Sequence, residues 1–280
     1  MDLKTWSSIL TFLSGGVLGG FIGGATKFFW EKYLPDRMTW RRQQQVDREK
    51  LMSQVRGPAI RAMHGLERRI FGTVDEQAGG YRNIKQEGQA EYYINATTFQ
   101  IAECCAWIEI LRDKMGALDY AELETHLSEL SQTLLGGYRP HFHVFLLEQR
   151  EIGERMVSIA NGEIFCKGYS EFLDLINRQD APLCFTHLKA RVTTMLDNWG
   201  PEAEKLLRIQ HSLVDMLKFL DPAGRWIIEA RRPEKLNAKQ VIDKLQKSNL
   251  VEAKEADELR KQAREDGLTE KVSRHRAPAQ

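Results

Sequence analysis

The residues of this chain that could do chemistry are a pair of histidines and a few cysteines. His141 and His143 are two positions apart, so on a helix their side chains point roughly 200° apart and cannot bind one metal ion. We interpret them as polar residues in the first turn of a helix. A strand-like local geometry, or ligands from a neighbouring subunit, would be the alternative.

The four cysteines lie at positions 104, 105, 166 and 184, without a CxxC pair and without histidines at zinc-site spacing. Cys104 and Cys105 fall in an apolar helical run, which favours buried structural thiols over redox chemistry. Unpaired cysteines fit a reduced cytoplasmic setting. We expect no metal site and no cofactor.

Catalytic motifs give no better candidate. Helical nucleases of the HEPN type pair an Arg with a His at a spacing that does not occur in this chain. Three residues separate Arg139 from His143, two separate Arg61 from His64, and eight separate Arg178 from His187. The chain also lacks a Walker A loop, an HExxH motif and a GxSxG motif. We therefore predict no catalytic residues and a protein that is not an enzyme.

The elements that would position these residues are helices, because apolar residues recur at helical spacing and no sustained period-2 run is bounded by hairpin turns. Pro35 precedes a polar stalk helix, and Gly57-Pro58 separates it from the next. The predicted helices cover residues 36–56, 59–71, 91–115, about 119–134, 140–160, 163–178, 182–198, 202–220, a segment opened by Asp221-Pro222, and 250–265.

The predicted helix 140–160 has a continuous apolar face. It directs toward a core the side chains of Phe142, Phe145, Leu146, Ile152, Met156 and Ile159. It leaves for solvent the side chains of Glu148, Arg150, Glu151 and Arg155.

An uncharged, mostly apolar run at residues 6–30 predicts a membrane span. From Trp6 to Thr26 the chain has 21 residues without a charge. A helix of that length measures roughly 31 Å, the thickness of the hydrocarbon core of a bilayer. A secretory signal peptide, cleaved near Ala25, is the main alternative.

Six glycines in this run form two parallel GxxxGxxxG ladders: Gly15, Gly19 and Gly23, and Gly16, Gly20 and Gly24. Small residues let helix backbones approach closely in lipid, so we interpret the ladders as an oligomerisation surface. Two adjacent stripes favour a ring or bundle of identical spans, each with two neighbours. A dimer and a lone span remain alternatives.

Aromatic and basic residues flank the span and predict its membrane interfaces and orientation. The interface residues are Trp6, Lys27, Phe28, Phe29, Trp30, Lys32, Tyr33, Arg37, Arg41 and Arg42. The excess of Lys and Arg after the span places that side in the cytoplasm and the N-terminus outside. We therefore predict an inner-membrane protein whose C-terminal domain is cytoplasmic.

Composition divides the chain into four parts. Residues 1–33 form the glycine-rich transmembrane helix, 34–56 a basic juxtamembrane stalk, 57–235 a cytoplasmic all-helical domain, and 236–280 charged peripheral helices with a disordered tail. The net charge of +1 gives no reason to expect a nucleic-acid partner, although the juxtamembrane bases suit anionic lipid. The soluble part, residues 46–280, carries enough apolar residues to fold without the span.

The layout of a short glycine-rich span and a cytoplasmic helical domain is similar to that of small bacterial membrane effectors, including some in phage-defence systems. We therefore expect a homo-oligomer that forms a pore or permeabilises the membrane under the control of its domain. One alternative is a membrane-anchored adaptor that recruits an unknown protein partner. The third is a membrane-bound enzyme such as a HEPN-like nuclease, which the missing motif disfavours.

Overall fold

The structure is a computed structural model of the 280-residue chain. It describes residues 34–74, 88–116, 121–136, 142–160, 163–197, 199–227, 233–247 and 251–268. The predicted span and its glycines lie outside these ranges. No helix within them combines the length and the apolar character needed to cross a membrane.

The described residues are mostly helical, which confirms the coarse prediction of an all-α chain. Nine helices and one hairpin fall within the described ranges. In chain order these are α3 (Leu34–Val74), α4 (Gln89–Gly116), α5 (Ala121–Leu135), α6 (Leu146–Met156), β1 (Val157–Ala160), β2 (Glu163–Cys166), α7 (Tyr169–Ile176), α8 (Leu183–Asp197), α9 (Trp199–Leu220), α10 (Ala238–Lys247) and α11 (Ala253–Glu265).

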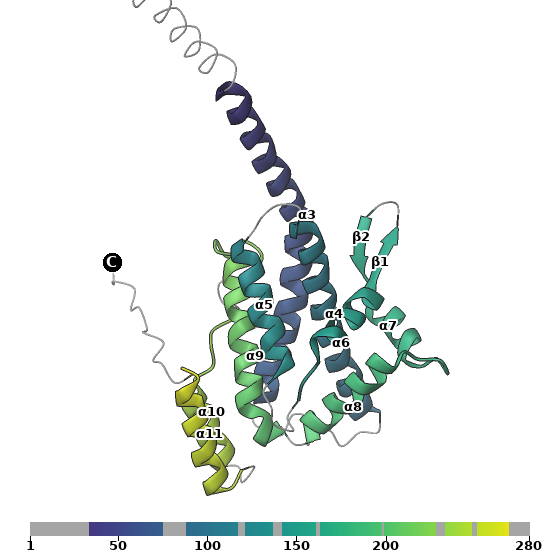
Figure 1. The fold of residues 1–280 in the computed structure, drawn as a ribbon. Helices are drawn as coiled ribbons and strands as arrows, with labels where there is room; N and C mark the ends of the chain where they lie inside the picture. Colours follow the sequence, from purple (N-terminus) through teal and green to yellow (C-terminus); the bar gives the residue numbers. More distant parts are fainter. Residues whose placement is uncertain are drawn as a thin grey trace, which may run out of the picture. The chain divides into compact units, whose positions relative to one another are not determined.

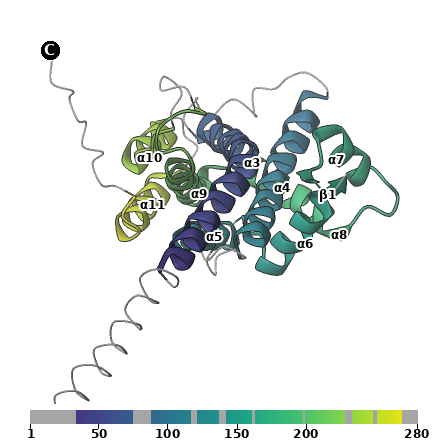
Figure 2. The ribbon, with the colours of Figure 1, turned by 90° about the horizontal axis from the view of Figure 1, so that it is seen from above.

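The chain divides into two compact units, Met1–Gln54 and Val55–Gln280. In the second unit, α3 lies between α4 and α9 (Figures 1 and 2). Polar contacts join it to both neighbours: Arg69 donates to Gln100 of α4, and Gln210 of α9 donates to Glu67. On the α4 side lie α6, α7, α8 and the hairpin, whereas α10 and α11 pack on α9 (Figure 1).

The predicted break at Gly57-Pro58 is wrong, because α3 continues through both residues. A proline inside a helix removes one hydrogen bond and costs about 3 kcal/mol. The turns that follow Pro58 offset this cost by burying apolar side chains. Ala59, Ile60, Ala62, Met63 and Leu66 are each at most 1% exposed.

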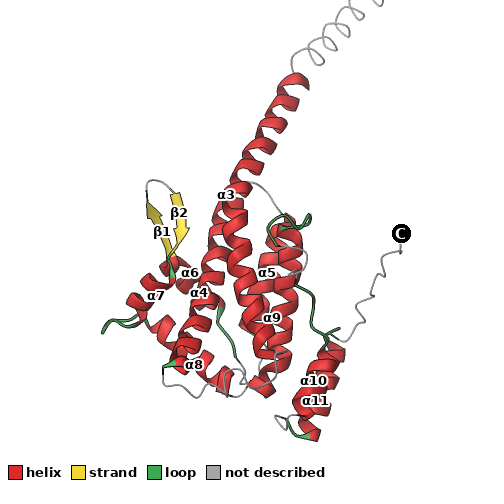
Figure 3. Ribbon diagram, turned by 180° about the vertical axis from the view of Figure 1, so that it is seen from behind, coloured by secondary structure: helices red, strands yellow, loops and turns green. Residues whose placement is uncertain are grey.

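The predicted helices 140–160 and 163–178 are also wrong in their bounds. An antiparallel β1–β2 hairpin separates α6 from α7 (Figure 3). Val157 pairs with Cys166 and Ile159 pairs with Ile164. The sequence carries a signal for this hairpin, since Asn161-Gly162 stands between two short apolar runs.

The apolar face predicted for residues 140–160 is only partly correct. Phe142, Ile152 and Met156 are buried, but Phe145, Leu146 and Ile159 are exposed. Glu148, predicted to face solvent, is instead largely covered and forms an ion pair with Arg191 of α8. Phe145 precedes α6 and Ile159 follows it in β1, so neither shares the buried face of the helix, whereas Leu146 is the first residue of α6 and lies on its exposed side.

Two predicted helix starts near prolines are wrong. The helix predicted for residues 202–220 begins earlier, at Trp199, so Gly200-Pro201 lies in the first turn of α9, where proline loses no helical hydrogen bond. Asp221-Pro222 opens a turn instead of a helix. The Asp221 carboxylate accepts the backbone N–H groups of Arg225, Trp226 and Ile227, at 2.8, 3.0 and 3.1 Å.

The other predicted helices are present. The prediction for residues 91–115 corresponds to α4, that for 182–198 to α8, and that for 250–265 to α11. Gly267 follows α11 with a φ of 68°, the left-handed conformation that favours glycine after a helix. The first two segments have long apolar runs at helical spacing, whereas α11 is mostly charged and was predicted from the residues at its ends.

Candidate functional site

The site residues predicted from the sequence lie almost entirely outside the described ranges. This holds for the six glycines of the ladders, for the aromatic residues from Trp6 to Tyr33, and for Lys27 and Lys32. Arg37, Arg41 and Arg42 belong to the first turns of α3. The oligomerisation surface and the membrane interface therefore stay predictions.

Trp226 packs against α3 near the start of the second unit. A Cβ atom added to Gly57 would lie 2.6 Å from the Trp226 ring, so only glycine allows this contact. Pro58, the next residue, lacks an N–H group and weakens the helix at the same point. The three hydrogen bonds to Asp221 hold the loop that carries Trp226. The indole thus lies on the part of α3 whose own hydrogen bonding is incomplete.

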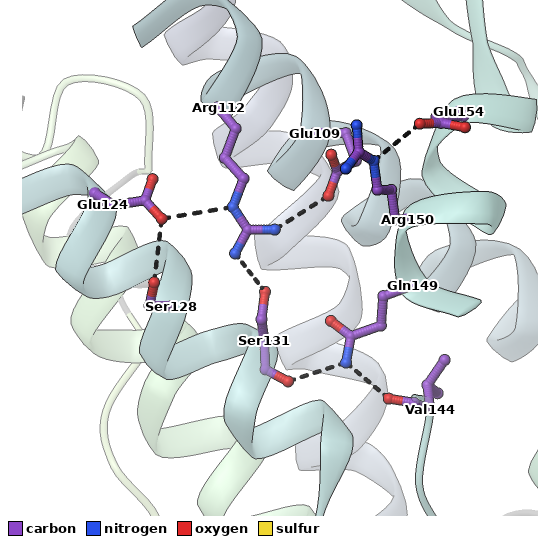
Figure 4. A network of polar contacts seen from close by, with 9 residues as sticks. All are labelled: Glu109, Arg112, Glu124, Ser128, Ser131, Val144, Gln149, Arg150 and Glu154. Atoms are coloured by element: carbon purple, nitrogen blue, oxygen red, sulfur yellow. Dashed lines mark hydrogen bonds and ion pairs between the residues drawn. The ribbon is translucent and has the colours of Figure 1, made fainter. Parts of the chain in front are cut away.

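A polar cluster joins α4 to α5 (Figure 4). The Arg112 guanidinium lies 3.1 Å from the Glu109 carboxylate and 3.7 Å from that of Glu124. It also donates to the Ser131 hydroxyl at 3.0 Å. One arginine side chain of α4 thus contacts a carboxylate and a hydroxyl of α5, and these contacts tie the two helices together.

Gln149 extends the cluster to α6 (Figure 4). Its buried Nε2 donates to the carbonyls of Ser131 at 3.0 Å and Val144 at 2.8 Å. Gly153, one turn further along α6, lets this helix approach α4 closely. A Cβ there would lie 2.7 Å from Glu109 Cγ and 2.9 Å from the Cys105 carbonyl oxygen. The three helices therefore meet at one tightly packed point.

Arg191 of α8 fixes the segment that leads into α6. Its guanidinium pairs with Glu148 and donates to the His143 carbonyl at 3.1 Å. The same guanidinium lies 5.6 Å from the Phe145 ring centroid, and the His143 ring meets Phe145 edge-on at 4.8 Å. His143 is thus part of a structural contact with an aromatic neighbour, while His141 lies outside the described residues.

A second, more deeply buried polar link joins α3 to α9. Gln210, fully buried, donates to the Glu67 carboxylate and to the Glu234 carbonyl, both at 2.8 Å, and accepts the Leu236 N–H at 3.2 Å. Burial raises the pKa of Glu67 above its ordinary value, although the hydrogen bond from Gln210 opposes the rise. The link spans 143 residues of sequence.

Two further residues of α9 hold the chain around the end of α5. Lys205 donates to the carbonyl of Thr133, and burial lowers its pKa to about 8. Glu202 accepts the N–H of Phe142 at 2.9 Å. A cation at a helix C-terminus and a buried carboxylate on a backbone amide are both stabilising arrangements.

The thiols of the four cysteines are protonated at neutral pH. Burial is the largest cause in each case: it raises the pKa to about 12 for Cys104 and Cys166 and to about 11 for Cys184, and well above the ordinary value for Cys105. Such thiols are poor nucleophiles. Among the described residues, no group of three or more His, Cys, Asp or Glu side chains is placed to hold a metal ion.

Comparison with known proteins finds no match to a family model, to a curated protein or to a solved structure. The polar groups of the second unit connect helices to one another. Several large apolar side chains are exposed, among them Phe145, Leu146 and Leu147 at the start of α6 and Ile159 in the hairpin that follows it. The helical period of residues 140–160 had placed Phe145, Leu146 and Ile159 in the core.

Proposed function

We propose that this protein is a homo-oligomeric, single-span protein of the bacterial inner membrane that forms a pore or permeabilises the membrane, as a defence effector does. Its N-terminus lies outside, and its cytoplasmic helical domain controls assembly or opening. The oligomer forms through the two glycine ladders, and the juxtamembrane bases contact lipid, including anionic lipid.

One observation carries this proposal: a single helix leads from the end of the predicted span into the domain core. The predicted membrane segment ends just before α3 begins at Leu34, and α3 continues to Val74. Its later turns supply Ile60, Met63 and Leu66, which are buried between α4 and α9. A change in domain packing therefore acts on the same helix that follows the span.

Replacement of the central glycines tests this function. Gly19→Leu or Gly20→Leu adds a side chain where the backbones approach, while the span becomes more hydrophobic and still inserts. We expect the detergent-solubilised complex to become smaller and ion flux into liposomes to be lost, both measured on the full-length protein. Val17→Leu, on the proposed lipid-facing half of the span, is the matched control and should change neither. Variants that keep both size and flux would refute the ring.

The second candidate function is a membrane-anchored adaptor that binds another protein through its domain. The exposed Phe145 and Leu147 at the start of α6 favour it, since exposed apolar side chains that are neighbours often mark binding surfaces. Glycine variants that lose the oligomer but keep the cellular function would support this candidate. Retained oligomers without ion flux would do the same.

A further inference from the structure

The helix α3 has a weak point in its interior, at Gly57 and Pro58. In an α-helix the N–H of residue 58 would donate to the carbonyl of Gln54, four residues earlier. Proline has no N–H, so α3 lacks this hydrogen bond. The glycine beside it is a poor helix former because its backbone is so free. Two consecutive residues thus lower the resistance of α3 to bending.

This weak point coincides with the boundary between the two compact units, Met1–Gln54 and Val55–Gln280. Gln54, the last residue of the first unit, is the one whose carbonyl would pair with an N–H at position 58. Ala59 and Ile60, which follow Pro58, are at most 1% exposed. Burial therefore holds α3 on the domain side of the weak point.

The indole of Trp226 packs on α3 at the same place. A Cβ added to Gly57 would lie 2.6 and 2.8 Å from two atoms of the six-membered ring, closer than real Cβ contacts are. A larger residue at position 57 would therefore displace the ring. Trp226 itself is 52% exposed, so its indole covers the weak point without belonging to the core.

The loop that carries Trp226 is fixed to the end of α9. Asp221, the first residue after α9, donates its N–H to the Leu217 carbonyl at 2.8 Å. Its carboxylate is buried and accepts the N–H groups of residues 225–227. Gly224 forms the turn between them with a φ of 64°, a conformation that favours glycine. The loop thus gives α9 a firm contact with α3.

We propose that Gly57 and Pro58 form a joint in α3, that Trp226 locks this joint, and that the lock lets the domain control the span. The inference rests on the proposed function, in which α3 carries a change in domain packing to the membrane segment. A helix transmits such a change only while it stays rigid, and the indole supplies the rigidity that the missing hydrogen bond does not.

The other polar link between α3 and α9 cannot replace this lock. It joins Gln210 to Glu67, which lies about 15 Å further along α3 than Gly57. It therefore fixes the buried part of α3 and leaves the joint to Trp226.

Amide hydrogen exchange of the full-length protein in detergent tests the lock. Trp226→Ala removes the half-exposed indole, so we expect the amides of residues 52–60 to exchange about tenfold faster than in the wild type. The amides of residues 62–70, in the buried turns of α3, should keep their wild-type rates.

Tyr92→Ala is the matched control. Tyr92 is an aromatic residue of similar exposure, 59%, and its ring meets Tyr169 of α7. Its neighbour Tyr93 forms a hydrogen bond with Thr73, near the opposite end of α3 from the joint. The substitution should therefore leave the exchange of residues 52–60 unchanged.

A second substitution tests whether the missing hydrogen bond is the cause. Pro58→Ala supplies the N–H that proline lacks, so the double variant Trp226→Ala/Pro58→Ala should regain slow exchange of residues 52–60. Unchanged exchange in Trp226→Ala would overturn the lock. An equal rise over residues 62–70 would overturn it too, because it would indicate general destabilisation. A double variant that exchanges as fast as Trp226→Ala would overturn the role of Pro58.

Ion flux into liposomes separates failure of the lock from failure of the proposed function. Trp226→Ala should lower the flux by about fivefold or more, the low end of the usual coupling between sites, and added Pro58→Ala should restore it. A wild type that carries no ions refutes the pore and leaves the exchange result standing. A Trp226→Ala variant that exchanges faster but conducts like the wild type overturns the control of the span by the lock.

Discussion

The α3–α9 link and the Arg112 contacts between α4 and α5 both join helices through polar side chains, but they differ in their access to water. Gln210 and Glu67 are at most 2% exposed, and every hydrogen-bonding atom of the Gln210 amide is occupied. Arg112 and Glu124 remain partly exposed. A buried link is costly to break because its partners cannot turn to solvent, whereas an exposed one exchanges its bonds for water. The burial of the hydrogen-bonded groups, more than the number of their bonds, therefore determines how much stability is lost when the contact is removed.

The largest effect is expected for Gln210→Ala. It removes three hydrogen bonds and leaves the Glu67 carboxylate, the Glu234 carbonyl and the Leu236 N–H without this partner. Buried groups that lose their partners cost about 1–3 kcal/mol each, so we expect the free energy of unfolding to fall by roughly 3 kcal/mol. Urea denaturation of residues 46–280 measures it. A decrease in the free energy of unfolding below about 1 kcal/mol would contradict the inference that the buried contacts stabilise the fold more than the exposed ones.

A smaller effect, dependent on pH, is expected for Glu67→Gln, which keeps the shape of the side chain. Because the folded-state pKa of Glu67 is raised, the folded protein binds this proton more tightly than the unfolded chain does. The wild type should therefore lose stability as the pH rises from the ordinary value of 4.5 through the raised pKa. The variant lacks this titrating group, so the difference in the free energy of unfolding between variant and wild type should grow as the pH rises through this range. Parallel stability profiles would show that Glu67 does not titrate as inferred.

The smallest effect is expected for Arg112→Met, which keeps the aliphatic stem of the arginine and removes its three polar contacts. Since Arg112 is partly exposed, the free energy of unfolding should fall by about 1 kcal/mol or less. Arg150→Met is the control, because the Arg150–Glu154 pair is exposed and isolated on one helix. It should change stability by less than about 0.5 kcal/mol. A loss for Arg112→Met as large as that for Gln210→Ala would remove the distinction between the two regions.

Part of the fold could be predicted from the sequence and part could not. The helices α4 and α8 were predicted because each has an apolar stripe at helical spacing over ten or more residues, and α11 was predicted from the residues at its two ends, Asn249 with Glu252 and Gly267. The hairpin was missed although Asn161-Gly162 marks it, because four-residue strands are too short to show a period. The continuity of α3 through Pro58 could not be predicted, because it depends on the burial of the apolar residues that follow, which offsets the cost of a proline inside a helix.

The sequence by itself determined the helical class, most helix positions, the uncharged run with its glycine ladders, and the near-zero net charge. These properties follow from local composition and spacing. Only the tertiary structure decided that Glu67 and Gln210 meet, that Glu148 is paired with Arg191, and that Phe145, Leu147 and Ile159 are left exposed. The physical reason is that burial of a side chain is decided by partners far along the chain, which helical periodicity does not reveal.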